Sequence, residues 1–76
     1  MTRAYVTVMT GAGVSQDVVA ELRGITEVKR ADIVAGEFDI IAEIETESER
    51  DLLALVTEKI QSIPGVGRTS TCIVLG

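Results

Sequence analysis

The chain has 76 residues, of which 46% are hydrophobic, and its formal net charge is −5. A chain this short can build only one core, so we expect a single globular domain over residues 1–76. It has no histidine, one tyrosine, one phenylalanine and seven dispersed basic residues. This composition excludes imidazole chemistry at a catalytic or metal site and argues against direct nucleic-acid binding.

Two further features concern the cellular location. The lone cysteine, Cys72, cannot form an internal disulfide, which fits a reducing cytoplasm. No apolar run approaches the roughly 18 residues that cross a bilayer, and the N-terminus lacks a signal-peptide pattern. We therefore expect a cytoplasmic protein without a membrane partner.

The first half of the chain predicts a strand, a helix and a second strand. Residues 4–9 alternate between two faces in the period of a β-strand. After the loop TGAG, Ser15 is expected to cap a helix whose apolar stripe ends at Gly24. A second strand is expected over residues 28–35, and Gly36 ends it.

The second half of the chain predicts the same order of a strand, a helix and a strand. The third strand is expected over residues 38–45, with an apolar face formed by Phe38, Ile40, Ala42 and Ile44. Ser48 is expected to cap the second helix, with Asp51 completing a variant capping box. Pro64 ends that helix, and the last strand is expected over residues 68–75.

The resulting order is β-α-β-β-α-β, and its two halves echo each other. Leu22 and Val28 correspond to Ile60 and Val66 at a constant offset of 38 residues (60 − 22 = 66 − 28). Two such βαβ halves predict an α+β, ferredoxin-like sandwich with a four-stranded antiparallel sheet. Right-handed crossovers place both helices on one face of that sheet.

The other face of the sheet is then uncovered, although it is not polar. Tyr5, Met9 and Ile41 fall opposite the apolar side chains of their strands, and residues 72–75 do not alternate at all. Covering these side chains with a second copy would stabilise a small domain, so we expect a homodimer. The alternative is a monomer that leaves some apolar residues exposed.

Two short polar stretches are candidates for a binding pocket. Gly36, Phe38 and Asp39 lie at a predicted hairpin turn, and Thr69 and Thr71 precede the apolar end of the last strand. Asp39 could accept from a primary amine, while hydroxyls and backbone N–H groups could bind a carboxylate. The alternative is that these are ordinary hairpin and β-strand residues.

Other chemical motifs are weaker. TGAGVSQD resembles a dinucleotide loop, but Gln16 stands where glycine or alanine is needed. The carboxylates of residues 43–51 have no calcium-loop spacing and are expected to form a solvated acidic face. Cys72 has no histidine partner and is expected to be a buried structural thiol. We therefore expect no enzyme activity, cofactor or metal.

From Tyr5 to Leu75 the chain resembles the C-terminal effector (RAM) domain of the Lrp/AsnC family of leucine-responsive and asparagine-regulatory transcription factors. The similar segments are ITEVKRADIVAGEFDIIAEI and IPGVGRTSTCIVL. They contain a strand ending in V-x-G, an aromatic–Asp pair, a P-G-V turn and T-x-T before an apolar strand. Full-length members add an N-terminal helix-turn-helix module, so the chain resembles stand-alone members that lack it.

This resemblance implies a non-enzymatic sensor of a small molecule, an amino acid, built from dimers that associate into rings. It places the ligand among Ala35, Gly36, Phe38, Asp39, Thr69, Thr71 and Cys72, at contacts between dimers. A full-length Lrp/AsnC regulator or an enzyme is a candidate partner, and regulation of transcription or amino-acid metabolism the expected role. An oligomerisation module without a ligand and an ACT-like regulatory domain remain as alternatives.

Overall fold

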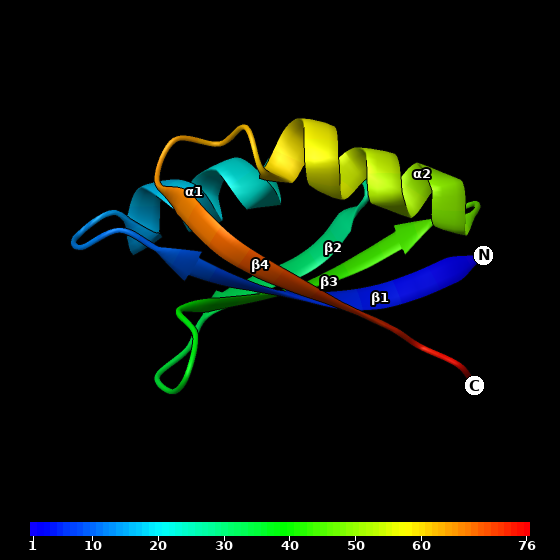
Figure 1. Cartoon of the computed structure of the whole chain (residues 1–76), viewed down its shortest axis with the longest axis horizontal. Helices are drawn as coiled ribbons and strands as arrows, with labels where there is room; N and C mark the ends of the chain where they lie inside the picture. The colour runs from blue at the N-terminus through cyan, green and yellow to red at the C-terminus, as the bar shows by residue number, and fades with distance from the viewer.

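The computed structural model describes all residues, 1–76, and has the element order β-α-β-β-α-β (Figure 1). The elements are β1 (Thr2–Thr10), α1 (Ser15–Arg23), β2 (Val28–Ile33), β3 (Ile40–Thr46), α2 (Glu49–Ala54), its π-helical continuation η1 (Leu55–Ile60) and β4 (Val66–Ile73). The strands form one sheet in the order β2-β3-β1-β4, and each neighbouring pair is antiparallel. The predicted ferredoxin-like fold is confirmed.

Both helices lie on the same face of the sheet, and the core fills the space between these two layers (Figure 1). On β1, Ala4, Val6 and Val8 are fully buried, as the alternation of the sequence predicts. Leu22 and Ile60, which correspond in the two halves of the sequence, are fully buried near the ends of their helices. The repeat therefore marks equivalent core positions.

The two helices begin differently from each other. Ser48 accepts a 3.1 Å hydrogen bond from the backbone N–H of Asp51, so its predicted cap is confirmed. The predicted Ser15 cap is wrong, because Ser15 is the first residue of α1 and no side chain caps that helix. The Ser15 hydroxyl instead lies 2.7 Å from the hydroxyl of Thr10.

The boundaries of all four strands differ from the predicted ones, and β1 runs from Thr2 to Thr10 rather than over residues 4–9. β2 ends at Ile33 and β3 begins at Ile40, so residues 34–39 form a turn outside the sheet. A 2.8 Å hydrogen bond from Val34 N–H to the carbonyl of Asp39 closes this turn. Phe38 is therefore not part of the apolar face of β3, and β4 runs from Val66 to Ile73 rather than over residues 68–75.

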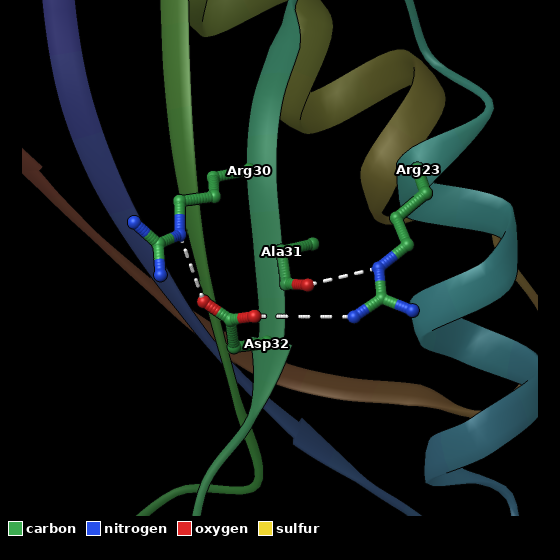
Figure 2. A network of polar contacts seen from close by, with 4 residues as sticks. All are labelled: Arg23, Arg30, Ala31 and Asp32. Atoms are coloured by element: carbon green, nitrogen blue, oxygen red, sulfur yellow. Dashed lines mark hydrogen bonds and ion pairs between the residues drawn. The ribbon is translucent and has the colours of Figure 1, made fainter.

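The outer edge of β2 is partly covered by a side chain from α1 (Figure 2). Arg23 Nε donates a 3.0 Å hydrogen bond to the carbonyl of Ala31, and its guanidinium lies 3.9 Å from Asp32 Oδ1. Arg30 Nε contacts the other oxygen of Asp32 at 3.2 Å. These contacts satisfy one carbonyl of an edge strand, a position that otherwise invites pairing with another chain.

Candidate functional site

Three loops lie at the end of the molecule opposite the two termini (Figure 1). They are residues 11–14 after β1, the 34–39 turn between β2 and β3, and residues 61–65 before β4. The backbone N–H of Gly11 donates to the carbonyl of Gly65 at 3.0 Å, which ties the first loop to the third. Two of the three loops are therefore tied to each other directly.

Asp39 ties the 34–39 turn to β1. Its backbone N–H donates to the carbonyl of Val8 at 3.0 Å, and its Oδ2 accepts from the backbone N–H of Thr10 at 2.8 Å. No other hydrogen bond or ion pair within the chain involves this half-buried carboxylate. Oδ2 therefore has a structural role, and Oδ1 has no hydrogen-bond partner within the chain.

The predicted residues of β4 divide between the two faces of the sheet. Thr69 and Thr71 pair with Val8 and Val6 of β1, so they point toward the helices. Cys72 pairs with Tyr5 and points to the opposite face. The hydroxyl of Thr69 accepts a 2.6 Å hydrogen bond from the Gln61 side chain, just after η1.

A hollow of about 320 Å³ lies beside the 34–39 turn, between that turn and the paired strands β1 and β4. It is lined by Thr7, Met9, Glu37, Phe38, Arg68, Thr69 and Ser70. Of the predicted site residues, Phe38 and Thr69 line this hollow, although the Thr69 side chain points to the helix face, where its hydroxyl accepts from Gln61. The other five (Ala35, Gly36, Asp39, Thr71 and Cys72) do not line it within one chain.

Five lining residues were not anticipated from the sequence: Thr7, Met9, Glu37, Arg68 and Ser70. Thr7 and Ser70 become neighbours only through the register in which β1 pairs with β4. Glu37 and Arg68 stood within the two recognised segments, and their opposite charges were the signal that could have drawn attention to them.

The sheet face turned away from the helices carries several accessible apolar side chains. Tyr5 is 38% exposed and Met9 40% exposed, and Ile41 is half-buried beside Thr7. Cys72 is exposed, so the prediction of a buried thiol is wrong for the single chain. Leu75 lies beyond β4 and is 94% exposed, so residues 72–75 are not buried on two sides within one chain.

A second hollow, of about 410 Å³, lies near the start of α2 and is strongly acidic. Its charged lining residues are Glu27, Glu45, Glu47, Asp51, Glu58 and Lys59. Glu27 Oε1 is buried there without a hydrogen-bond partner. No group of three or more Cys, Asp or Glu side chains is arranged to hold a metal ion.

The fold and the hollow beside the 34–39 turn together define an α+β module of ferredoxin-like topology with room for a small molecule. The family model of the Lrp/AsnC ligand-binding domain matches residues 3–76. The chain belongs to this family, which favours the Lrp/AsnC interpretation of the sequence over the ACT-like one.

Individual relatives agree with this assignment. The chain is 37% identical over 54 residues to a proline dehydrogenase transcriptional activator of Rhizobium radiobacter, covering 71% of this chain and 35% of that protein. A solved hypothetical protein from Pyrococcus horikoshii is 38% identical with a TM-score of 0.93, covering 100% of this chain and 92% of that one. A transcriptional regulator from Neisseria meningitidis, solved as an L-Met complex, shares the fold at 21% identity and a TM-score of 0.91, over 99% of this chain and 50% of that one.

The extent of the matches differs among these relatives. The chain spans 35% and 42% of the lengths of two curated transcriptional regulators that it matches. The matched part is the ligand-binding domain.

Neither helix of the chain has the length and apolar character needed to cross a membrane.

Proposed function

We propose that this chain is a cytoplasmic, non-enzymatic sensor of an amino acid, folded as one domain over residues 1–76. Binding would change its assembly or its contacts with a partner, and so regulate transcription or amino-acid metabolism. The observation that carries this proposal is that the hollow beside the 34–39 turn, in a member of a ligand-binding family, is lined by Phe38 and Thr69.

The predicted ligand residues outside the hollow fit a site that a neighbouring subunit completes. Ala35 and Gly36 lie exposed on the 34–39 turn, where a second subunit can reach them. The free oxygen of Asp39 can accept from a ligand ammonium, and Cys72 lies on the same sheet face as the hollow, whereas Thr71 lies on the helix face. An L-Met complex in a protein of the same fold supports an amino acid as the ligand class.

The open sheet face supports assembly as a homodimer, the unit from which rings of dimers would form. Its apolar side chains, Tyr5, Met9 and Ile41, remain in contact with water in the single chain. Burying apolar surface contributes about 25 cal/mol per Å², a useful gain for a domain with a small core. An oligomerisation module without a ligand would use the same face.

The partners follow from charge and family. A net charge of −5 offers few groups to neutralise DNA phosphates, so this chain should not bind duplex DNA itself. A full-length Lrp/AsnC regulator or an enzyme is a suitable protein partner, because curated relatives regulate transcription.

Sedimentation equilibrium tests the proposal when the chain is measured alone and with each of the twenty standard amino acids at about 5 mM, which exceeds even a weak, roughly 1 mM Kd. We expect a dimer or larger species without ligand, and a shift in the association constant with at least one amino acid. An oligomer that no amino acid changes, and to which none binds, would support the oligomerisation module instead.

A further inference from the structure

We infer that a groove along the helix layer is a docking surface for an extended, basic segment of a partner protein. Lysine or arginine side chains of that segment meet the carboxylates of the groove, and its apolar side chains meet the apolar part of the lining. The inference rests on the proposed function for the expectation of a protein partner, and it adds the chemistry of that partner and the place where it binds.

The first support is that three neighbouring hollows form one groove. The acidic hollow of about 410 Å³ near the start of α2 shares Glu58 and Lys59 with a hollow of about 300 Å³ between α1 and η1. This second hollow shares Glu21 and Pro64 with a third, of about 450 Å³, along α1. We call the three together the helix-side groove.

The second support is the charge of the helix-side groove. The five carboxylates of the acidic hollow are joined by Asp17 and Glu21 of α1, whereas Lys59 is the one basic side chain in the lining. Seven carboxylates and one ammonium give the groove a side-chain charge of −6. The whole chain carries −5, so all other residues together carry +1. The acidic excess of the chain is therefore concentrated in the groove.

The third support is that the chain does not neutralise these carboxylates itself. Its three ion pairs are Arg3–Glu43, Arg23–Asp32 and Arg30–Asp32, and none of them includes a carboxylate of the groove. Glu27 Oε1 is buried without a hydrogen-bond donor. Unpaired like charges that lie close together repel one another, and cations of a bound partner would relieve this repulsion. Charge complementarity therefore favours a basic partner.

The apolar part of the lining and the length of the groove favour a protein segment over a small cation. Val14 and Ile25 are half-buried in the groove and Pro64 is exposed, so their apolar surface is accessible to a partner. The longest dimension of the molecule is 34 Å. An extended chain covers about 3.3 Å per residue, so a segment of about ten residues is long enough to follow the groove.

The position of the groove leaves the other proposed contacts free. It lies on the side of the helices, whereas the face proposed for the homodimer is on the opposite side of the sheet (Figure 1). None of its lining residues belongs to the 34–39 turn. A partner in the groove can therefore bind the assembled protein.

Fluorescence anisotropy tests this inference with labelled peptides of about ten residues built from Lys-Leu-Ser repeats. One control peptide has glutamate in place of lysine, another has glycine in place of leucine, and spermidine serves as a small polycation. The proteins are the wild type, Glu21→Lys and Glu58→Lys. Glu49→Lys is the matched control, because Glu49 is exposed on the second helix but lines none of the three hollows.

We expect the wild type to bind the Lys-Leu-Ser peptide, to bind the glycine peptide and spermidine more weakly, and not to bind the glutamate peptide. Raising the salt from about 0.05 M to about 0.5 M should weaken the binding, because salt screens the charges. Glu21→Lys and Glu58→Lys should each weaken it by roughly ten-fold, since repulsion replaces attraction. Glu49→Lys should stay within about two-fold of the wild type.

Several results would overturn the inference. Equal losses in Glu49→Lys and the two groove variants would mean that net charge alone attracts the peptide. Equal wild-type affinity for spermidine or for the glycine peptide would exclude a protein docking surface, whether or not the variants fold. A wild type that does not bind the Lys-Leu-Ser peptide also overturns it. No amino acid is present in this assay, so these results leave the proposed amino-acid sensing intact; the sedimentation experiment tests that separately.

Discussion

The carboxylate of Asp39 and the backbone N–H of Thr10 form a 2.8 Å hydrogen bond that joins the 34–39 turn to the end of β1. Thr10 in turn contacts Ser15, the first residue of α1, through their hydroxyl groups at 2.7 Å. A group that binds the free oxygen of Asp39 would therefore act on a connected path to the first helix. Asp39 combines a structural bond with a predicted ligand contact.

Substituting Asp39 in two ways separates these roles. Asp39→Asn keeps a side-chain oxygen that can accept from Thr10, so we expect its melting temperature to stay near the wild-type value. Asp39→Ala leaves a partly buried N–H without its partner and should cost about 1–3 kcal/mol. Thermal melts followed by circular dichroism measure both effects.

The same two variants should lose roughly ten-fold or more in affinity for the amino acid that binds the wild type, because both lack the negative charge. Calorimetric titration measures this at a temperature where each variant is folded. Wild-type affinity in Asp39→Asn would leave Asp39 with its structural role alone.

Alanine substitutions at three glycines should lower the free energy of unfolding by different amounts. At Gly65, with φ of 97°, an added Cβ would lie 2.9 Å from Val14 Cγ2. Gly13 has φ of 77° but nothing within 4 Å, and Gly36 has neither a positive φ nor a close neighbour. We expect Gly13→Ala to cost about 1–2 kcal/mol for the left-handed backbone and Gly65→Ala to cost more.

Gly36→Ala is the matched control, and it should be neutral or stabilising by up to about 1 kcal/mol. Urea unfolding curves for the three variants give the order directly. Equal losses at Gly65 and Gly13 would show that the contact with Val14 relaxes without cost.

The fold was predictable wherever one buried face spaces the apolar residues at the period of a strand or a helix. The alternation of residues 4–9 and the apolar stripe of α1 follow from one buried face, and both are confirmed. The Ser15 cap was predicted wrongly because the helix begins at Ser15 itself, whose hydroxyl contacts that of Thr10, five residues earlier. Phe38 was placed in the third strand because it continues the alternation of apolar residues in that strand, although it lies in the adjoining turn.

The candidate site was less accessible to sequence reasoning. Phe38 and Thr69 were proposed first from the short stretches that contain them and then through the resemblance, and both residues line one hollow. The rest of that hollow depends on Thr7 pairing with Ser70 across 63 residues of sequence. Local patterns do not contain this register, since it is fixed by the packing of the whole sheet.

The cap of the second helix predicts a local loss of stability. Ser48→Ala removes the acceptor for the Asp51 N–H, and caps of this kind contribute about 1 kcal/mol. In a domain of this size that corresponds to a fall of roughly 4–8 °C in melting temperature. Ser48→Asp retains an acceptor and should melt near the wild type. Equal losses in both variants would contradict a capping role.

If the open sheet face forms the homodimer interface, a charge placed on that face should dissociate the dimer. Ile41→Glu places a carboxylate on that face next to Thr7 and should shift the chain to monomer at low micromolar concentration. Leu53→Glu is the control, because Leu53 is 58% exposed on α2, on the other side of the molecule from this face. Sedimentation velocity distinguishes the two. A wild type that sediments as a monomer, or a dimer unaffected by Ile41→Glu, would contradict this interface.

The central claim is that the folded chain binds an amino acid, and a thermal-shift screen of the twenty standard amino acids on the purified wild type tests it most directly. A ligand at 100 times its Kd that binds only the native state adds about 2.7 kcal/mol. In a domain of this size that gain raises the melting temperature by roughly ten degrees or more. We predict such a rise for at least one amino acid with an apolar side chain. A cooperative melt that none of the twenty displaces, even at millimolar concentration, would contradict the account.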